Sequence, residues 1–295
     1  MMRLPRWIAQ HLAAARALLV FTVLLGLAYP LAMVAVARIP GRSDRADGSL
    51  IDHNGTVVGS RLIGQSFTDA DGHPLRQYFQ SRPSAAGAGY DPTATSASNL
   101  GPESIVDALP DPADPASGRA SLLTQVCRRS KAVGELEGVD GARPFCTSDG
   151  VGAVLAVYRR DGLTGPVIRA VSLNQPCPAS PWITTYEGVT VECGTYGEDY
   201  SRGVPTPIRG DAPAHPAVPV DAVTSSGSGL DPAISPAYAA VQAPRIAKAR
   251  GTDLRTITAL IDEFTTSRFL GFIGEPAVNV LELNLALDQR YPFHP

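Results

Sequence analysis

The sequence lacks a strong excess of charge of either sign. Its 295 residues include 25 Lys and Arg and 28 Asp and Glu, which gives a net charge of −3 at pH 7. Charges of both signs are scattered along the chain, so the basic footprint typical of nucleic-acid-binding proteins is missing. We therefore expect no nucleic-acid partner.

Residue patterns that mark metal or catalytic centres are also scarce. The five histidines are isolated, and none is paired with a second ligand at helical or hairpin spacing: His11, His53, His73, His215 and His294. The four cysteines form no C-x-x-C motif, which zinc and redox sites commonly use. The sequence thus predicts no metal site and no catalytic site of its own.

Long apolar runs are missing as well, with one exception. Residues 17–37 (ALLVFTVLLGLAYPLAMVAVA) carry no charged side chain over 21 residues. A helix of that length covers about 31 Å, one hydrocarbon core, so the run predicts a single transmembrane helix in the lipid bilayer. Pro30 lies inside the run and indicates either a partner helix that satisfies the freed carbonyl or a simple kink.

A cleavable secretory signal is the alternative for this terminus. Arg3 and Arg6 supply a positive start, and residues 35–37 (AVA) satisfy the small-x-small rule for cleavage. The apolar run, however, is longer than the roughly 7–15 residues of a signal-peptide core. A retained anchor with a short cytoplasmic N-terminus at residues 1–16 is favoured.

Basic residues do not orient the helix, because three lie on each side of it. The cysteines indicate an orientation instead. All four fall in one segment rich in Pro, Gly and Ser: Cys127, Cys146, Cys177 and Cys193. Their even number fits two disulfides, which persist in an oxidising compartment, with three pairings open; four buried free thiols are the alternative. We expect a single-pass plasma-membrane protein with a cytoplasmic N-terminus and an extracytoplasmic C-terminal domain.

The chain after the span predicts a mixed α+β domain. Asn54 and Gly55 stand between two runs of β-formers, the strongest short-range hairpin signal, because both turn positions need positive φ. The hairpin strands are expected near residues 49–52 and 56–63. Further on, Tyr78 and Phe79 are expected to be apolar anchors.

Composition changes over residues 103–217. Prolines cluster at both edges, and the segment carries 14 acidic and 10 basic residues, a charge of −4 against +1 for the rest. Alternating β-formers predict strands at residues 152–159, 167–174 and 183–193. We interpret the segment as an inserted β-rich subdomain with a thin core, stabilised by disulfides that contribute about 2–4 kcal/mol each. Residues 38–102 and 218–295 then form the extracytoplasmic domain that hosts it.

The C-terminal part of the chain is predicted to be helical. One helix is expected over residues 233–250, ending at Gly251 and kinked or split by Pro244. Thr252 can cap a second helix, whose apolar stripe consists of Leu254, Ile257, Leu260, Ile261 and Phe264. Residues 278–287 fit either a strand or a helix, and a helix is favoured.

A Gly-Ser turn at residues 225–229 is the stretch most similar to a binding loop. It has neither the glycine spacing of a nucleophile elbow nor the lysine of a phosphate-binding P-loop. Free N–H groups in such a turn, placed before a helix, can bind an anion. The favoured interpretation is an ordinary turn with Asp231 as the helix cap.

Several motifs occur in a fixed order outside residues 103–217. They are GLAYPL (26–31), DGSLI (47–51), VVGSRLIGQ.F (57–67), YFQSRPSA (78–85), SNLGP (98–102), VPVDAVTSSGSGLDPAISP (218–236), ARG (249–251) and GFIGEPAVNVLELNLALD (271–288). Together they closely resemble the KdpC subunit family of the bacterial high-affinity potassium-transporting P-type ATPase, the Kdp complex. The family has a short connection where residues 103–217 stand here, so the cysteine-bearing segment is an atypical insertion, which loop-closure entropy tolerates.

The resemblance implies an accessory single-span subunit with three partners: a channel-like potassium-conducting subunit, an ATP-hydrolysing P-type subunit and a small single-helix subunit. It implies that the chain stabilises their assembly and, as a catalytic chaperone, raises the ATP affinity of the P-type subunit. No tightly bound cofactor is implied. ATP is the nucleotide that the resemblance suggests, and potassium is the transported ion.

By the same resemblance, the nucleotide role falls on a glutamine in the helix after the Gly-Ser turn, Gln242. The turn residues are further candidates: Ser226, Gly227, Ser228 and Gly229. Pro244 departs from the aliphatic residue usual in the family, and a domain outside the membrane meets no cytoplasmic ATP. The assembly role is therefore favoured over nucleotide binding.

Two other functions stay open as alternatives. One is a membrane-anchored extracellular hydrolase that uses Ser228, which the lack of catalytic motifs disfavours. The other is a stand-alone envelope binding module, which would stay monomeric when extracted in mild detergent.

Overall fold

The computed structural model describes residues 5–95 and 101–294. The chain forms two compact units, Met1–Leu62 and Ile63–Pro295. Helices and strands are both present in the described residues, which confirms the mixed fold expected from the sequence. Arg3 and the first three residues of the SNLGP motif, 98–100, lie outside the described residues.

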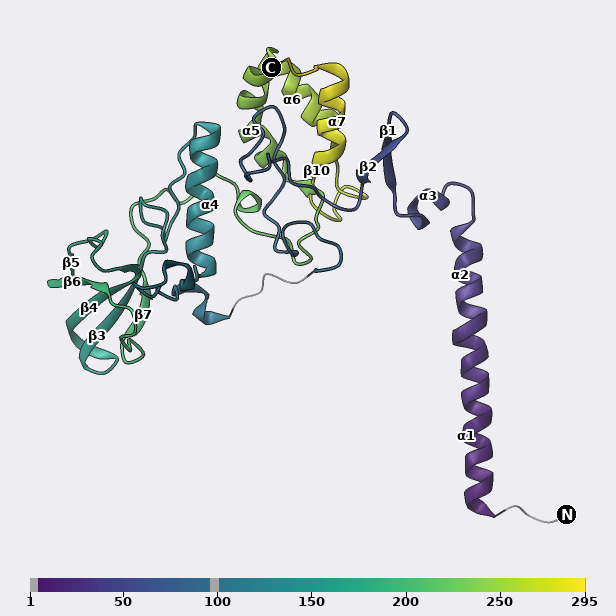
Figure 1. The fold of residues 1–295 in the computed structure, drawn as a ribbon, viewed down its shortest axis with the longest axis horizontal. Coiled ribbons are helices and arrows are strands. Elements are labelled where there is room, and N and C mark those ends of the chain that lie inside the picture. The colour runs from purple at the N-terminus through teal and green to yellow at the C-terminus, as the bar shows by residue number, and fades with distance from the viewer. Residues whose placement is uncertain (1–4, 96–100, 295) are drawn as a thin grey trace. The chain divides into compact units, whose positions relative to one another are not determined.

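One apolar helix dominates the first unit (purple in Figure 1). It runs from Arg6 to Ala37, contains no buried side chain, and is long and apolar enough to cross a membrane. The helix begins at Arg6 rather than at residue 17, because residues 6–16 are rich in alanine, the strongest helix former. The predicted apolar helix is thus confirmed and extended at its N-terminal end.

The helix changes its winding just before Pro30. It starts as α1 (Arg6–Val23), passes through a π-helical turn, η1 (Leu24–Ala28), and continues as α2 (Tyr29–Ala37). Pro30 has no N–H for the carbonyl four residues earlier, and its ring crowds that carbonyl. The wider π turn absorbs this mismatch, so the helix continues beyond the proline.

A short helix, α3 (Ser43–Ala46), and an antiparallel hairpin complete the first unit. The hairpin strands are β1 (Leu50–His53) and β2 (Thr56–Ser60). Asn54 and Gly55 have φ angles of 55° and 79°, so the predicted turn is confirmed. β2 ends at Ser60, before the predicted residue 63.

Helices α5 (Pro236–Arg250), α6 (Leu254–Glu263) and α7 (Val280–Arg290) form the main core of the second unit together with a small sheet (Figure 1). The sheet is antiparallel, in the order β8 (Ala233–Ile234), β10 (Ala277–Asn279), β9 (Thr265–Thr266). A 3₁₀ turn, η4 (Val220–Ala222), leads into this part. The largest fully buried side chains of the core include Phe79, Ile246, Ile257, Leu283 and Leu287. Phe79 is therefore a buried apolar anchor, as the sequence predicts, whereas Tyr78 is only partly buried and its hydroxyl donates to Asp288 at 2.9 Å.

The helix ends are set by local capping residues. Ser235 caps α5 by accepting the Tyr238 N–H, and Gly251 ends it with a φ of 62°. α5 is continuous through Pro244, so the predicted split is wrong. Asp253, rather than Thr252, caps α6, because its carboxylate accepts the Thr256 N–H.

The favoured helix at residues 278–287 is confirmed as α7, which Asn279 caps. Its first predicted residues belong to β10 instead.

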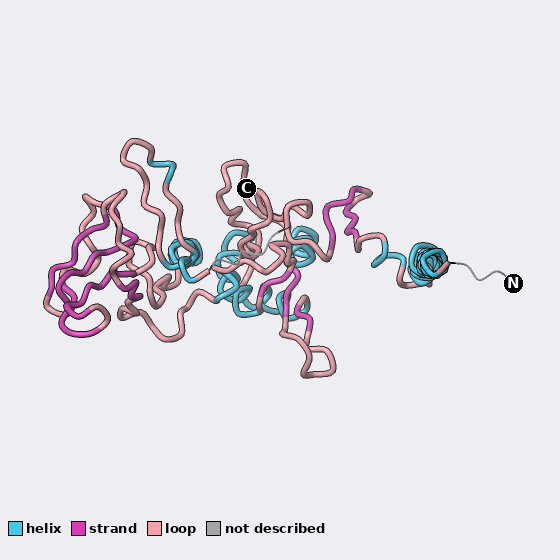
Figure 2. Tube along the Cα trace, turned by 90° about the horizontal axis from the view of Figure 1, so that it is seen from below, coloured by secondary structure: helices cyan, strands magenta, loops and turns pink. Residues whose placement is uncertain are grey.

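The cysteine-bearing segment, residues 103–217, contains a five-stranded sheet (among the magenta strands of Figure 2). The order is β5-β6-β4-β3-β7, antiparallel except for the β4–β6 pair. The strands are β3 (Val154–Asp161), β4 (Thr164–Pro176), β5 (Thr185–Tyr186), β6 (Val189–Gly194) and β7 (Val204–Pro207). The predicted strand regions are confirmed, and β7 is an addition.

The segment is not simply β-rich, because it also contains α4 (Leu122–Glu137), which the sequence pattern did not predict. Two 3₁₀ turns, η2 (Pro102–Ile105) and η3 (Pro115–Ser117), precede it. Ser121 caps α4 by accepting the Thr124 N–H, and Gly138 ends it with a φ of 70°. These two capping residues are the features of the sequence that indicate α4, because its apolar positions are too sparse to form a clear stripe.

α4 lies between the five-stranded sheet and helix α5 (Figure 1). Its Val126 and Val133 pack against the main core, whereas Leu123 packs against one face of the sheet. Alternate residues of β3 contribute to two clusters, because successive side chains point to opposite faces. One cluster contains Val154, Ala156, Val171 and Leu173; the other contains Leu155, Val157, Val167, Ala170 and Val191. The sheet therefore has two small clusters of its own, and α4 connects the segment to the main core of its host.

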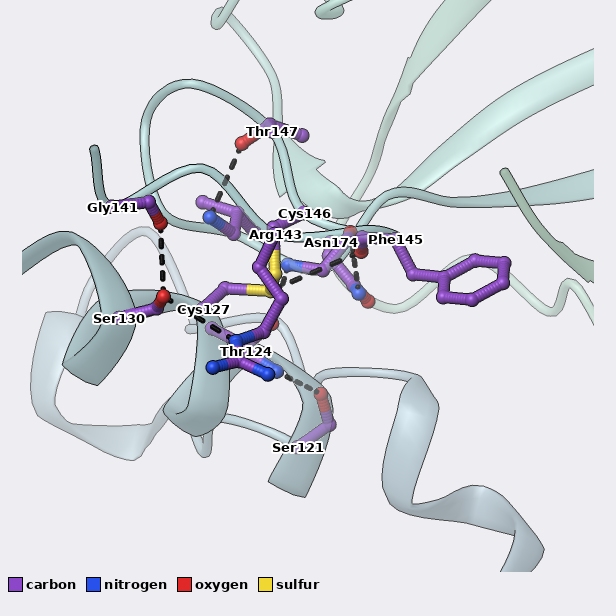
Figure 3. The surroundings of a disulfide bond; sticks show 12 residues. Ser121, Thr124, Cys127, Ser130, Gly141, Arg143, Phe145, Cys146, Thr147 and Asn174 are labelled. Atoms are coloured by element: carbon purple, nitrogen blue, oxygen red, sulfur yellow. Dashed lines mark hydrogen bonds between the residues drawn. A yellow bond between two sulfur atoms is a disulfide. The ribbon is translucent and has the colours of Figure 1, made fainter. Parts of the chain in front are cut away.

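The cysteines pair with their nearest neighbours in sequence, Cys127 with Cys146 and Cys177 with Cys193. The Cα atoms of the two pairs are 5.4 and 5.1 Å apart, within the usual range for disulfides. Figure 3 shows the first disulfide, which ties α4 to the loop before β3. Two disulfides are thus present, as the even cysteine count predicts, and the four free thiols of the alternative are not.

Replacing Cys127 and Cys146 together by serine should lower the free energy of unfolding by about 3 kcal/mol, because the crosslink closes a loop between residues 19 apart. Calorimetry of the purified full chain in detergent measures this loss. The double serine variant of Cys177 and Cys193 is the matched control and should show a loss of similar size. A wild-type chain whose melting temperature does not change on reduction would contradict the pairing.

Candidate functional site

A stretch at residues 76–84, which we call the clamped segment, begins with a turn at residues 76–77 and continues without regular secondary structure. Its residues 79 and 80 are buried in the main core, and in the described part of the chain no strand pairs with it. Two side-chain amides form the backbone hydrogen bonds that a neighbouring strand would otherwise form. Asn284 of α7 accepts the Phe79 N–H at 2.9 Å and donates to the Phe79 carbonyl at 3.0 Å. Gln242 of α5 accepts the Gln80 N–H at 2.6 Å and donates to the Gln80 carbonyl at 3.1 Å. Each amide therefore satisfies both backbone groups of one buried residue.

Two arginines of α5 bind further carbonyls of the clamped segment. Arg245 donates to the carbonyls of Arg76 and Tyr78, and also to the Gln242 amide oxygen at 3.0 Å. Arg250 donates to the Gln77 carbonyl at 3.0 Å and pairs with Asp288 of α7 at 2.8 Å. Together with the two amides, these side chains bind each carbonyl from residue 76 to residue 80.

The cysteine-bearing segment reaches this site through Glu137, at the end of α4. Its carboxylate pairs with Arg245 at 2.9 Å, and the two side chains are only 0% and 3% exposed. Burial raises the pKa of Glu137 against the opposing effect of Arg245, because the ionised carboxylate has lost its water. The pair fixes Arg245 in the position from which it holds the clamped segment.

The Gly-Ser turn contacts the other end of the clamped segment. Arg82 pairs with Asp231 at 3.0 Å, and the Ser84 hydroxyl donates to the Gly229 carbonyl at 2.6 Å. The Gly64 N–H donates to the Leu230 carbonyl at 2.9 Å. The predicted site residues therefore contact the clamped segment at two different points: Gln242 contacts it at Gln80, and the turn contacts it at Ser84.

Hydroxyl groups within the turn bind its own N–H groups. The Ser226 hydroxyl accepts from Gly229 at 3.1 Å, and the Ser228 hydroxyl accepts from Leu230 at 3.1 Å. The Ser228 hydroxyl, which the hydrolase alternative would use as its nucleophile, is thus engaged with the backbone of the turn. The arrangement is that of an ordinary turn.

Asp231 is not the helix cap that the sequence predicts. Ser235 caps α5, while Asp231 pairs with Arg82 and accepts the Ala233 N–H at 3.0 Å. Asp221 lies at the same helix end and accepts from both the N–H and the hydroxyl of Ser235, at 2.6 and 3.0 Å. A carboxylate therefore already occupies the position that favours an anion.

A separate cluster involves His73, which is isolated by its sequence spacing from the other histidines and the cysteines. In the part of the chain that the structure describes, Asp69, Asp71 and His73 are the group whose ligand atoms lie within 4.8 Å of one another, and all three are exposed. The Asp69 carboxylate accepts the N–H groups of His73 and Asp71 at 2.8 and 3.0 Å. These bonds lower the pKa of Asp69 and account for the cluster as a hydrogen-bonded turn. The D-x-D-x-H spacing of these three residues is the sequence pattern that indicates this cluster.

Known protein families show what this chain is similar to. The family model of KdpC, the K⁺-transporting ATPase c chain, matches residues 11–108 and 205–289. The chain belongs to the KdpC family. Proteins named potassium-transporting ATPase KdpC subunit are similar to it, including that of Mycobacterium tuberculosis, 36% identical over 95% of this chain and 98% of the relative. Those of Caulobacter vibrioides and Kineococcus radiotolerans are each 38% identical, over 92% and 93% of this chain and 89% and 91% of the relatives.

The KdpC family match includes the whole clamped segment and its partners on α5 and α7, but not Glu137. Residues 109–204 separate its two matched ranges, as expected for an insertion.

Replacing Gln242 by leucine should lower the free energy of unfolding by about 2–4 kcal/mol, because the buried N–H and carbonyl of Gln80 lose their partner. Asn284→Leu should cost a similar amount for the same reason at Phe79. Chemical denaturation of the full chain in detergent measures both losses. Gln289→Leu, at an exposed position of α7, is the matched control and should change stability by less than about 0.5 kcal/mol. Equal stability of the Gln242 and Gln289 variants would contradict the clamp.

Proposed function

We propose that this chain is an accessory subunit of an ATP-driven potassium-transport complex and that it stabilises the assembly of the larger subunits. The family match over residues 11–108 and 205–289 is the observation that carries the proposal. Relatives that carry the name potassium-transporting ATPase KdpC subunit cover almost the full chain, which supports it.

In this proposal, potassium conduction and ATP hydrolysis belong to other subunits: a channel-like subunit, a P-type ATPase subunit and a small single-helix subunit. The support is the use of polar side chains in the candidate site. Gln242, Asn284 and Arg245 bind backbone groups and one another, and Gln242 is completely buried. Side chains engaged in this way hold the fold together instead of presenting reactive groups to a substrate.

The proposal also gives Gln242 an indirect role in any nucleotide effect. Its amide oxygen accepts from Gln80 and Arg245, and its amide nitrogen donates to Gln80. A nucleotide would have to displace these bonds to reach it. We therefore propose that Gln242 affects the P-type subunit indirectly, because it holds the clamped segment in its shape. The ATP itself is bound by the P-type subunit.

We further propose that the helix Arg6–Ala37 anchors the chain with its N-terminus in the cytoplasm. Residues 38–102 and 218–295 then form an extracytoplasmic domain with residues 103–217 inserted. The support is the two cysteine pairs, because disulfides persist in oxidising compartments.

A growth experiment tests the assembly role. A strain that lacks this chain but keeps the other transport subunits should fail to grow at micromolar potassium, and a plasmid with the full chain should restore growth. A plasmid with residues 38–295 directed to the same compartment by a cleaved signal is the matched comparison and should restore growth poorly, because the anchoring helix is lost. Equal growth of the strain with and without the full chain would refute the proposal.

The orientation has its own test. Trypsin added to intact spheroplasts should remove an epitope at the C-terminus and leave one at the N-terminus, because only the C-terminal domain is outside. Permeabilised cells are the control, in which both epitopes are lost. Protection of the C-terminal epitope until the cells are opened would reverse the proposed orientation.

A further inference from the structure

The loop between β9 and β10 exposes a group of large apolar side chains at residues 269–273, which we call the apolar tip. Phe269, Leu270 and Phe272 are 68%, 69% and 71% exposed, and Ile273 is 49% exposed. Isolated apolar residues on a surface are ordinary, but four within five positions form a contiguous patch. Such patches mark surfaces that another molecule covers.

The backbone of the apolar tip already satisfies its own polar groups. The Phe269 N–H donates to the Ile273 carbonyl at 2.8 Å, and the Ile273 N–H donates to the Phe269 carbonyl at 2.9 Å. The Gly271 N–H donates to the Arg268 carbonyl at 3.1 Å. The tip can therefore be buried against an apolar surface without leaving these groups unpaired.

Leu270 is held in a conformation that leucine disfavours. Its φ angle is 52°, in the left-handed region where Gly, Asn and Asp are the usual residues. Gly271 follows with a φ of 80°, which glycine adopts readily. A glycine or asparagine at 270 would relieve the strain, so the leucine side chain at the turn indicates a contact that uses it.

The apolar tip is mounted on a rigid part of the fold. β9 pairs with β10, and β10 leads directly into α7. α7 in turn holds the clamped segment through Asn284. A partner that binds the tip is thereby connected to the buried core of the domain.

The charges around the tip argue for a protein partner over a lipid surface. Arg268 and Glu275 pair with each other at its base, so the rim is neutral. Residues 265–276 contain no Lys, Trp or Tyr, and their one basic residue, Arg268, is the one that pairs with Glu275, so the segment offers no unpaired cation to anionic lipid headgroups. A turn of fixed shape, with a neutral rim and an apolar end, matches a preformed uncharged socket in a protein.

We propose that the apolar tip docks into an uncharged apolar socket on one of the larger membrane subunits of the transport complex. This inference rests on the proposed function and deepens it, because it names the surface that makes the contact. Phe269, Leu270 and Phe272 are the side chains that enter the socket.

Co-purification from native membranes in mild detergent tests the proposal with the full, epitope-tagged chain. The double variant Phe269→Ser and Phe272→Ser should reduce recovery of the larger subunits by about tenfold or more, as loss of interface anchors does. Leu163→Ser is the matched control, because Leu163 is 78% exposed but lies in the β3–β4 turn, and recovery should be unchanged. Both variants should melt at the wild-type temperature, since the replaced side chains are exposed.

A photocrosslinking amino acid, benzoylphenylalanine, in place of Phe272 identifies what covers the tip. An adduct with a larger transport subunit is the expected result. An adduct only with lipid, an adduct only with a second copy of this chain, or no adduct at all would each overturn the proposal, as would full recovery of the subunits by the double variant. If the wild-type chain recovers no transport subunits, the proposed function itself fails, and this outcome is distinct from failure of the tip alone.

Discussion

The clamped segment depends on hydrogen bonds that side chains make to its backbone. Its residues 79 and 80 are buried and belong to no sheet, yet their N–H and carbonyl groups still need partners. Asn284 and Gln242 provide them for Phe79 and Gln80, each with one donor and one acceptor. Because these amides come from α7 and α5, the segment also fixes the relation of the two helices. Loss of either amide would leave a buried donor and a buried acceptor unpaired.

The same region joins the cysteine-bearing segment to the rest of the second unit. Glu137 and Arg245 form a buried ion pair, and breaking one member of such a pair leaves an uncompensated charge in the interior. Arg129 and Arg143 add hydrogen bonds to the carbonyls of Val223 and Val218. With α4 packed against the main core, the segment is a structural part of the domain.

Elements with a strong local pattern could be predicted, and those without one were missed. Alternating β-formers located β3 and β4, and the φ requirement of Asn54 and Gly55 located the hairpin turn. α4 was missed because its apolar residues serve two different cores and form no single stripe. Pro244 did not split α5, which shows that tertiary packing can outweigh the roughly 3 kcal/mol that an interior proline costs.

What the sequence determined by itself is local: the apolar helix, the end of α5 at Gly251, the hairpin turn, the strand periodicity and the even number of cysteines. Each depends on residues within a few positions of one another or on composition alone. The partners of Gln242, Asn284 and Arg245 were decided only by the tertiary structure. They lie 162, 205 and 108 residues away in sequence, at Gln80, Phe79 and Glu137. The free energy of a buried polar group depends on the group that faces it, and in this protein folding alone brings those groups together.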